Sequence, residues 1–177
     1  MTDSKVDIAR ILAPALYILN KTGNKLNKQK LFKILYFADK EHIAKYGRTF
    51  TGEPYVAMAN GPVPSRLYDY IKLVEGKNRF PIPIDFVEEV KAHLGIEPPY
   101  WVISRTSVNM EFLSRSAINS LDHSIAIYKN KTFGELSDLS HDGAWKAANQ
   151  NTEMSVIEIA KAAGANDEMI SYIKESL

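Results

Sequence analysis

Residues 26–69 have the pattern of a deeply buried helix, then a short strand, then a second helix. Within residues 31–43, apolar side chains recur at helical spacing and cover an arc too wide for one contact face. They are Leu31, Phe32, Ile34, Leu35, Tyr36, Ala38 and Ile43. Asn27 is a suitable N-cap and Gly47 a suitable C-terminal cap. We therefore expect a central helix that is buried on more than one side.

A segment rich in glycine and proline leads from this helix to the next one. The alternation over residues 55–59 predicts a short strand. Residues 61–64 then form an elbow, because glycine permits unusual backbone angles and proline restricts φ. A helix with apolar positions between 67 and 74 follows. We expect the elbow to be a rigid, exposed turn that presents the start of this helix to a partner, with an ordinary structural turn as the alternative.

The remainder of the chain predicts further helices and one small sheet. Helical periodicity precedes residue 23 and recurs at 85–94, at 114–128 and in four short segments from residue 132 onward. Tyr100–Ser104 and Val108–Phe112 alternate as a hairpin does, and the strand near Tyr55 would complete a three-stranded antiparallel sheet. The expected fold class is mainly α (α+β): a single compact helical domain over residues 1–177 with a small antiparallel β-sheet or hairpin.

Composition excludes several classes of protein. The 177 residues include 22 Lys and Arg against 21 Asp and Glu, so no global field attracts the chain to nucleic acid or to a membrane. The absence of cysteine excludes disulfides and thiolate chemistry and fits a reducing cytoplasm. No apolar run approaches membrane length. We expect a cytoplasmic protein without a membrane partner.

Chemically reactive patterns are sparse. Asp39 and His42 lie three residues apart on one helix, a spacing that can hold a metal, and His141 is a possible third ligand. Together they are the basis for a hypothetical metal-dependent hydrolase, although local hydrogen bonding is the commoner role of such residues. The sequence contains neither a nucleophile elbow nor a phosphate-binding glycine loop. We expect no enzymatic activity, no cofactor and no metal.

Two features keep a DNA-binding regulator as the alternative function. The first is a basic face without an acidic residue, formed by Lys21, Lys25, Lys28, Lys30 and Lys33. The second is a C-terminal helical hairpin over residues 155–177, in which Ala160, Gly164 and Ile170 match the spacing of a helix-turn-helix. Its second helix contains Asp167 and Glu168, which DNA phosphates repel.

The most specific pattern lies in two blocks: a core motif over residues 26–75 and a second block over residues 113–147. The residues that define them are Lys30-Leu31, Lys33 to Asp39, Tyr46-Gly47-Arg48, Gly61 to Tyr68, Glu135-Leu136-Ser137, Leu139-Ser140-His141 and Ala144-Trp145. These segments resemble the Panacea domain family, also called the SocA-like antitoxin family. The resemblance covers most of the chain.

The resemblance implies a bacterial or phage antitoxin that neutralises a protein toxin by direct binding, the toxin being encoded next to it. Because the resemblance is strongest in the central helix and the elbow, we expect the toxin to bind there. The expected partner-binding residues are Lys33, Tyr36, Asp39, Gly61, Pro62, Val63, Pro64, Arg66, Tyr68 and Asp69. The alternative is that the two tyrosines belong to the core and that Asp69 pairs with Arg66 or Lys33 inside the fold.

Overall fold

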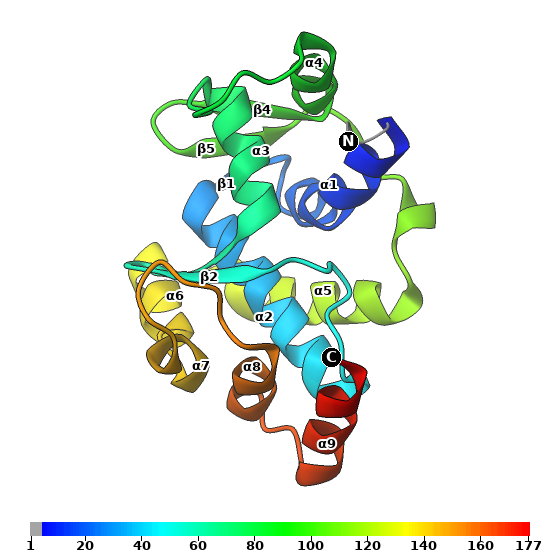
Figure 1. The fold of residues 1–177 in the computed structure, drawn as a ribbon. Helices are drawn as coiled ribbons and strands as arrows, with labels where there is room; N and C mark the ends of the chain where they lie inside the picture. The colour runs from blue at the N-terminus through cyan, green and yellow to red at the C-terminus, as the bar shows by residue number, and fades with distance from the viewer. Residues whose placement is uncertain (1–4) are drawn as a thin grey trace.

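The structure, a computed structural model, describes residues 5–177 as helices arranged around a central helix, α2, with two small antiparallel sheets (Figure 1). In chain order the elements are α1 (Lys5–Lys21), β1 (Lys25–Asn27), α2 (Lys28–Tyr46), β2 (Tyr55–Met58), β3 (Gly61–Pro64), α3 (Ser65–Glu75), α4 (Ile84–His93), β4 (Leu94–Glu97), β5 (Trp101–Ser104), the 3₁₀ helix η1 (Met110–Phe112), α5 (Arg115–Tyr128), α6 (Phe133–Ser140), α7 (Gly143–Ala147), α8 (Val156–Ala162) and α9 (Asp167–Ser176). The expected fold class is confirmed. Ser4, an expected helix cap, lies outside the described residues.

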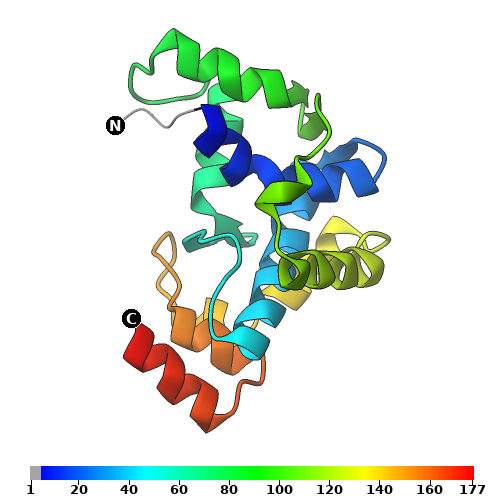
Figure 2. The same ribbon diagram turned by 90° about the vertical axis from the view of Figure 1, so that its right-hand side faces the viewer.

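Helix α2 is the common wall of two hydrophobic cores. Leu31 and Leu35 belong to a first core with α1, α3, α5 and the three-stranded sheet. Tyr36 and Ile43 belong to a second core with β2 and helices α6–α9. In Figures 1 and 2 the elements of the two cores lie toward opposite ends of the molecule, with α2 between them. The prediction of a central helix buried on more than one side is therefore confirmed.

Both ends of α2 have the caps that the sequence predicts. The side chain of Asn27 accepts hydrogen bonds from the amides of Gln29 and Lys30. Gly47 has a φ of 72°, the left-handed conformation that ends many helices, and its amide donates to the carbonyl of Ile43. The length of α2 is thus encoded locally. No helix among residues 5–177 has both the length and the apolar character needed to cross a membrane.

Leu35→Ala should lower the free energy of unfolding by about 2–5 kcal/mol, the range for truncating a buried leucine. The Leu35 side chain is 2% exposed and lies in the first core, so its truncation leaves a cavity. Urea unfolding at constant pH measures the change. A loss below about 0.5 kcal/mol, the size of a typical surface effect, would contradict the central position of α2.

A three-stranded sheet exists, but of the three predicted strands only Tyr100–Ser104, seen as β5, belongs to it. Strand β5 pairs with β4 on one side and with β1 on the other, both antiparallel. Val108–Phe112, predicted to be the second strand of the hairpin, is instead a loop followed by η1. The Asn109 side chain accepts from the amide of Glu111 and so begins a tight turn, while Val108 and Phe112 pack against the first core. The alternation reports this local packing and not a strand pairing.

The elbow is also different from its prediction. Residues Gly61–Pro64 form the strand β3, which pairs with β2 in a separate two-stranded sheet, and all four are buried. The strand near Tyr55 therefore does not join the sheet of β5. Residues 151–154 cover the other edge of β2, because the amide of Met154 donates to the carbonyl of Tyr55 at 2.7 Å. The prediction of an exposed turn is wrong: the elbow is an internal hairpin.

Candidate functional site

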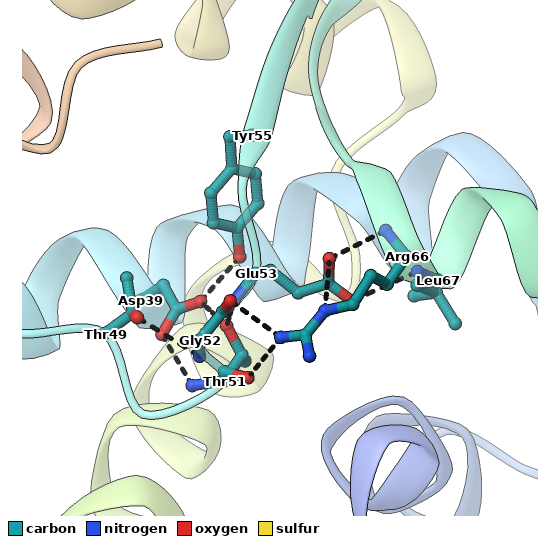
Figure 3. A network of polar contacts seen from close by, with 8 residues as sticks. All are labelled: Asp39, Thr49, Thr51, Gly52, Glu53, Tyr55, Arg66 and Leu67. Carbon is teal, nitrogen blue, oxygen red and sulfur yellow. Dashed lines mark hydrogen bonds and ion pairs between the residues drawn. The ribbon is translucent and has the colours of Figure 1, made fainter. Parts of the chain in front are cut away.

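Asp39 is a buried carboxylate that organises the loop following α2. It accepts hydrogen bonds from the hydroxyl of Tyr55 at 2.7 Å and from both the amide and the hydroxyl of Thr51 (Figure 3). It also accepts from the amide of Phe50 at 3.0 Å. Burial raises the pKa of Asp39 to about 6, although these hydrogen bonds favour its ionised form. Residues 47–54 are consequently fixed against the central helix.

Glu53, which the sequence pattern does not single out, caps helix α3 from a distance. Its carboxylate accepts from the amides of Arg66 at 2.9 Å and Leu67 at 3.0 Å. The N-cap residue, Pro64, has no side-chain acceptor for these first-turn amides, and a carboxylate there also interacts well with the helix dipole. Burial raises the pKa of Glu53. The missing local cap is the one sequence signal that could have indicated this residue.

The guanidinium of Arg66 closes the same network. It donates to the carbonyl of Gly52 at 2.6 Å and to that of Thr51 at 3.2 Å, and it lies 3.9 Å from the Glu53 carboxylate (Figure 3). The start of α3 is thus attached to the loop by both main chain and side chain. This network gives the surface around Arg66 a defined shape.

Lys33 is a buried lysine beneath the hairpin of β2 and β3. Its ammonium donates to the carbonyl of Pro62 at 2.8 Å, and burial lowers its pKa to about 7. Gly61, with a φ of 105°, lies directly above it. A Cβ atom added at Gly61 would be 2.3 Å from the hydroxyl oxygen of Ser140 and 3.0 Å from the Lys33 nitrogen. A glycine is therefore required here by both backbone angle and space.

A second polar cluster joins the two sequence blocks through Asp142. One of its carboxylate oxygens accepts from the Tyr36 hydroxyl at 2.8 Å and from the Lys40 ammonium at 2.7 Å. The other caps α7 by accepting from the amides of Ala144 and Trp145. Burial, followed by the nearby Asp142 charge, raises the pKa of Tyr36 well above its usual range. This cluster ties α7 to the central helix.

Most of the ten predicted partner-binding residues are inside the protein. Lys33, Tyr36, Asp39, Gly61, Pro62, Val63 and Pro64 are buried. Arg66 and Asp69 are the most accessible, with 41% and 62% of their side chains exposed. Tyr68 is half-buried and meets the Phe32 ring edge-on. Asp69 pairs with Lys72 at 2.7 Å, and not with Arg66 or Lys33. Only the start of α3 presents predicted residues to a partner.

The three residues of the hypothetical metal site have separate partners. His42 donates from Nδ1 to the carbonyl of Arg48 at 2.7 Å, so Nε2 is the acceptor for the hydroxyl of Ser116 at 3.0 Å. Asp39 is surrounded by the hydrogen-bond donors of the loop, and His141 stacks on Trp145 with ring centroids 3.8 Å apart. Within residues 5–177 no three His, Cys, Asp or Glu side chains are arranged to hold a metal ion.

Four of the five lysines of the predicted basic face have a local partner or are buried. Lys25 pairs with Glu97, and Lys28 pairs with Glu75 at 2.9 Å. Lys30 donates to the carbonyl of Lys129, and Lys33 is buried. Lys21 is exposed and contacts only the Tyr17 ring, so it is the one lysine of the predicted face without an acidic or carbonyl partner in the described structure. One such lysine is not the row of free cations that phosphate contacts require, and no observation on residues 5–177 favours DNA binding.

Comparison with known families gives a match over residues 31–146 to the family described as antitoxin SocA-like, Panacea domain. The matched region covers more than half of the chain. It includes α2 from Leu31 onward, the β2–β3 hairpin, α3 and the Asp142 cluster. No curated protein and no solved structure matches the chain.

Proposed function

The chain belongs to the SocA-like antitoxin family of Panacea domains, and from this premise we propose that it neutralises a cognate protein toxin by binding it directly. The observation that carries the proposal is the family match across both sequence blocks. The toxin is the product of a neighbouring gene, and the two proteins meet in the cytoplasm. Neutralisation requires no cofactor and no catalysis by this chain.

The contact surface we propose is the exposed start of α3, formed by Arg66, Tyr68 and Asp69. Tyrosine and arginine are the residue types that dominate binding energy at interfaces. The surface is also held rigid from below, because Glu53 caps the helix and the buried hairpin leads directly into it. A rigid surface loses little conformational entropy when a partner binds. The buried residues among the ten predicted ones do not contact the toxin; they hold this surface in its shape.

Asp69→Arg should reduce toxin neutralisation at least tenfold while leaving stability almost unchanged. Asp69 is an exposed acid paired with a lysine three residues later, so its reversal disturbs a partner far more than it disturbs the fold. The measurement is survival of cells that express the neighbouring toxin together with each variant, with the melting temperature of the purified protein measured in parallel. A tenfold effect corresponds to about 1.4 kcal/mol of binding free energy.

Glu88→Arg on α4 is the matched control. Glu88 is 66% exposed and also pairs with a lysine three residues later, Lys91. This control should neutralise the toxin as the wild type does. If Asp69→Arg also does so, the start of α3 is not the contact surface.

The next surface to test is then the groove of about 540 Å³ between α2, α5, α6 and α8, through Ile127→Asp and Leu139→Asp. If the wild type rescues no cell expressing a neighbouring gene, direct neutralisation itself is contradicted.

A further inference from the structure

A cavity of about 420 Å³ lies where α1, the loop of residues 47–54, α3 and the start of α5 meet. Three arginines line it, Arg10, Arg48 and Arg66, and of the described residues no aspartate or glutamate does. We infer that this cavity binds a phosphorylated small molecule through its phosphoryl group. The inference does not rest on toxin binding, although Arg66 lines this cavity and also belongs to the proposed toxin-contact surface.

The charge that faces the cavity is positive. The guanidinium of Arg48 has no hydrogen bond or ion pair within residues 5–177. Arg10 pairs with Asp7, and Arg66 lies 3.9 Å from Glu53, whose oxygens already accept from the amides of α3. The Nε atom of Arg66 is buried and has no hydrogen-bond acceptor in the described structure. An oxyanion in the cavity would supply the acceptor that the Arg48 guanidinium lacks, and paired donors of this type suit phosphate oxygens.

Another wall of the cavity also favours an anion. It is formed by the start of α5, a helix of 14 residues whose N-cap, Ser114, lines the cavity together with Ser116. The positive end of a helix dipole attracts anions. This wall is preformed, because Ser116 donates to the buried His42, which in turn donates to the carbonyl of Arg48.

The remaining lining explains why the ligand is a phosphorylated organic molecule. Phe50, Phe112, Ile11 and Pro14 add an apolar surface beside the charged groups. A cavity of this size lies within the range of small-molecule sites. It is too small for an element of a folded protein. A free phosphate shares the anionic chemistry but would leave the apolar surface unused.

Isothermal titration of the purified full-length protein tests the inference, with inorganic phosphate, phenyl phosphate and sodium chloride compared at equal ionic strength. We expect phenyl phosphate to bind with a Kd below about 1 mM and to raise the melting temperature, as any ligand of the folded state does. Arg48→Gln should weaken this binding at least tenfold. Because the Arg48 side chain makes no ion pair or hydrogen bond with the part of the chain that the structure describes, its replacement should leave the fold intact.

Arg79→Gln, which removes an exposed arginine outside the cavity, is the control and should bind as the wild type does. Equal affinity for inorganic and phenyl phosphate would assign the anion site to free phosphate and overturn the organic part of the inference. Equal heats from chloride, or equal losses in the Arg48 and Arg79 variants, would overturn the site as a whole. The assay contains no toxin, so each of these results leaves the antitoxin proposal standing.

Discussion

Asp39→Ala should lower the free energy of unfolding by about 4–6 kcal/mol at pH 7.5, an unusually large effect for one substitution. The variant leaves the amides of Phe50 and Thr51 and the hydroxyls of Thr51 and Tyr55 without their acceptor. Each buried donor without a partner costs about 1–3 kcal/mol. The substitution also removes a buried carboxylate whose raised pKa shows that burial disfavours its charge, and this gain offsets part of the cost. Urea unfolding of the variant and the wild type measures the difference.

Tyr55→Phe is the matched control, because it removes one donor and leaves the carboxylate in place. It should cost about 1 kcal/mol, the usual net value of a single hydrogen bond. If Asp39→Ala costs no more than Tyr55→Phe, the loop of residues 47–54 is held by other contacts, and the Asp39 network does not stabilise the candidate surface. The contrast therefore tests whether the four hydrogen bonds act together.

The parts of the fold that the sequence predicts are those with local causes. Helix α2 has a dense apolar stripe and a cap at each end, Asn27 and Gly47, so its limits follow from neighbouring residues. The same holds for α6, where Thr132 and Glu135, spaced three residues apart as a capping box requires, form that box. In each case the side chain that ends the helix lies within a few residues of the group that it satisfies.

The sheets could not be predicted, because strand pairing is not local. Strand β1 has three residues, too few to produce an alternating pattern, yet it pairs along its whole length with β5. Strand β3 contains two prolines, which usually argue against a strand. The two prolines are tolerated because β3 pairs with β2 alone, so its backbone needs no donors toward a further strand. The alternation of apolar and polar residues at Val108–Phe112 contains no information about a partner strand.

The candidate site was predicted by position but not by role. The predicted partner-binding residues do surround the elbow, but most of them are buried and support the surface without being part of it. Glu53 escapes a sequence search because its partners, the first amides of α3, are 13 and 14 residues away. Lys33 looks like any member of a basic run, and only the packing of the hairpin and α6 over α2 makes it a buried lysine. Burial is a property of the assembled fold, so such roles emerge only with the structure.

The buried Lys33 leads to the second large prediction, a rise in stability with pH between about 7 and 9.5. Its pKa is lowered from 10.5 in the unfolded chain to about 7 in the fold, with burial as the cause. The stability linked to this group is therefore fully present above pH 10.5 and is lost as the pH falls through 7. Within the window the slope is about 1.4 kcal/mol per pH unit. Asp39 does not mask it, because its raised pKa, about 6, removes stability only as the pH rises from 3.8 to 6.

Lys33→Met should abolish this slope, since methionine fills a similar volume without a titrating group. The variant loses the hydrogen bond to the Pro62 carbonyl, worth about 1 kcal/mol. It should nevertheless be more stable than the wild type at pH 6.5, where the buried ammonium is charged, and the advantage should shrink as the pH rises to 9.5. Urea unfolding at four pH values between 6.5 and 9.5 measures the difference. The upper limit of pH 9.5 keeps the folded-state Tyr17, whose pKa is raised to about 12, un-ionised. Lys146→Met, which removes an exposed lysine in place of a buried one, is the matched control and should retain the rise in stability with pH that Lys33→Met abolishes. A constant difference between Lys33→Met and the wild type would show that Lys33 keeps an ordinary pKa, and that the space beneath the hairpin admits water.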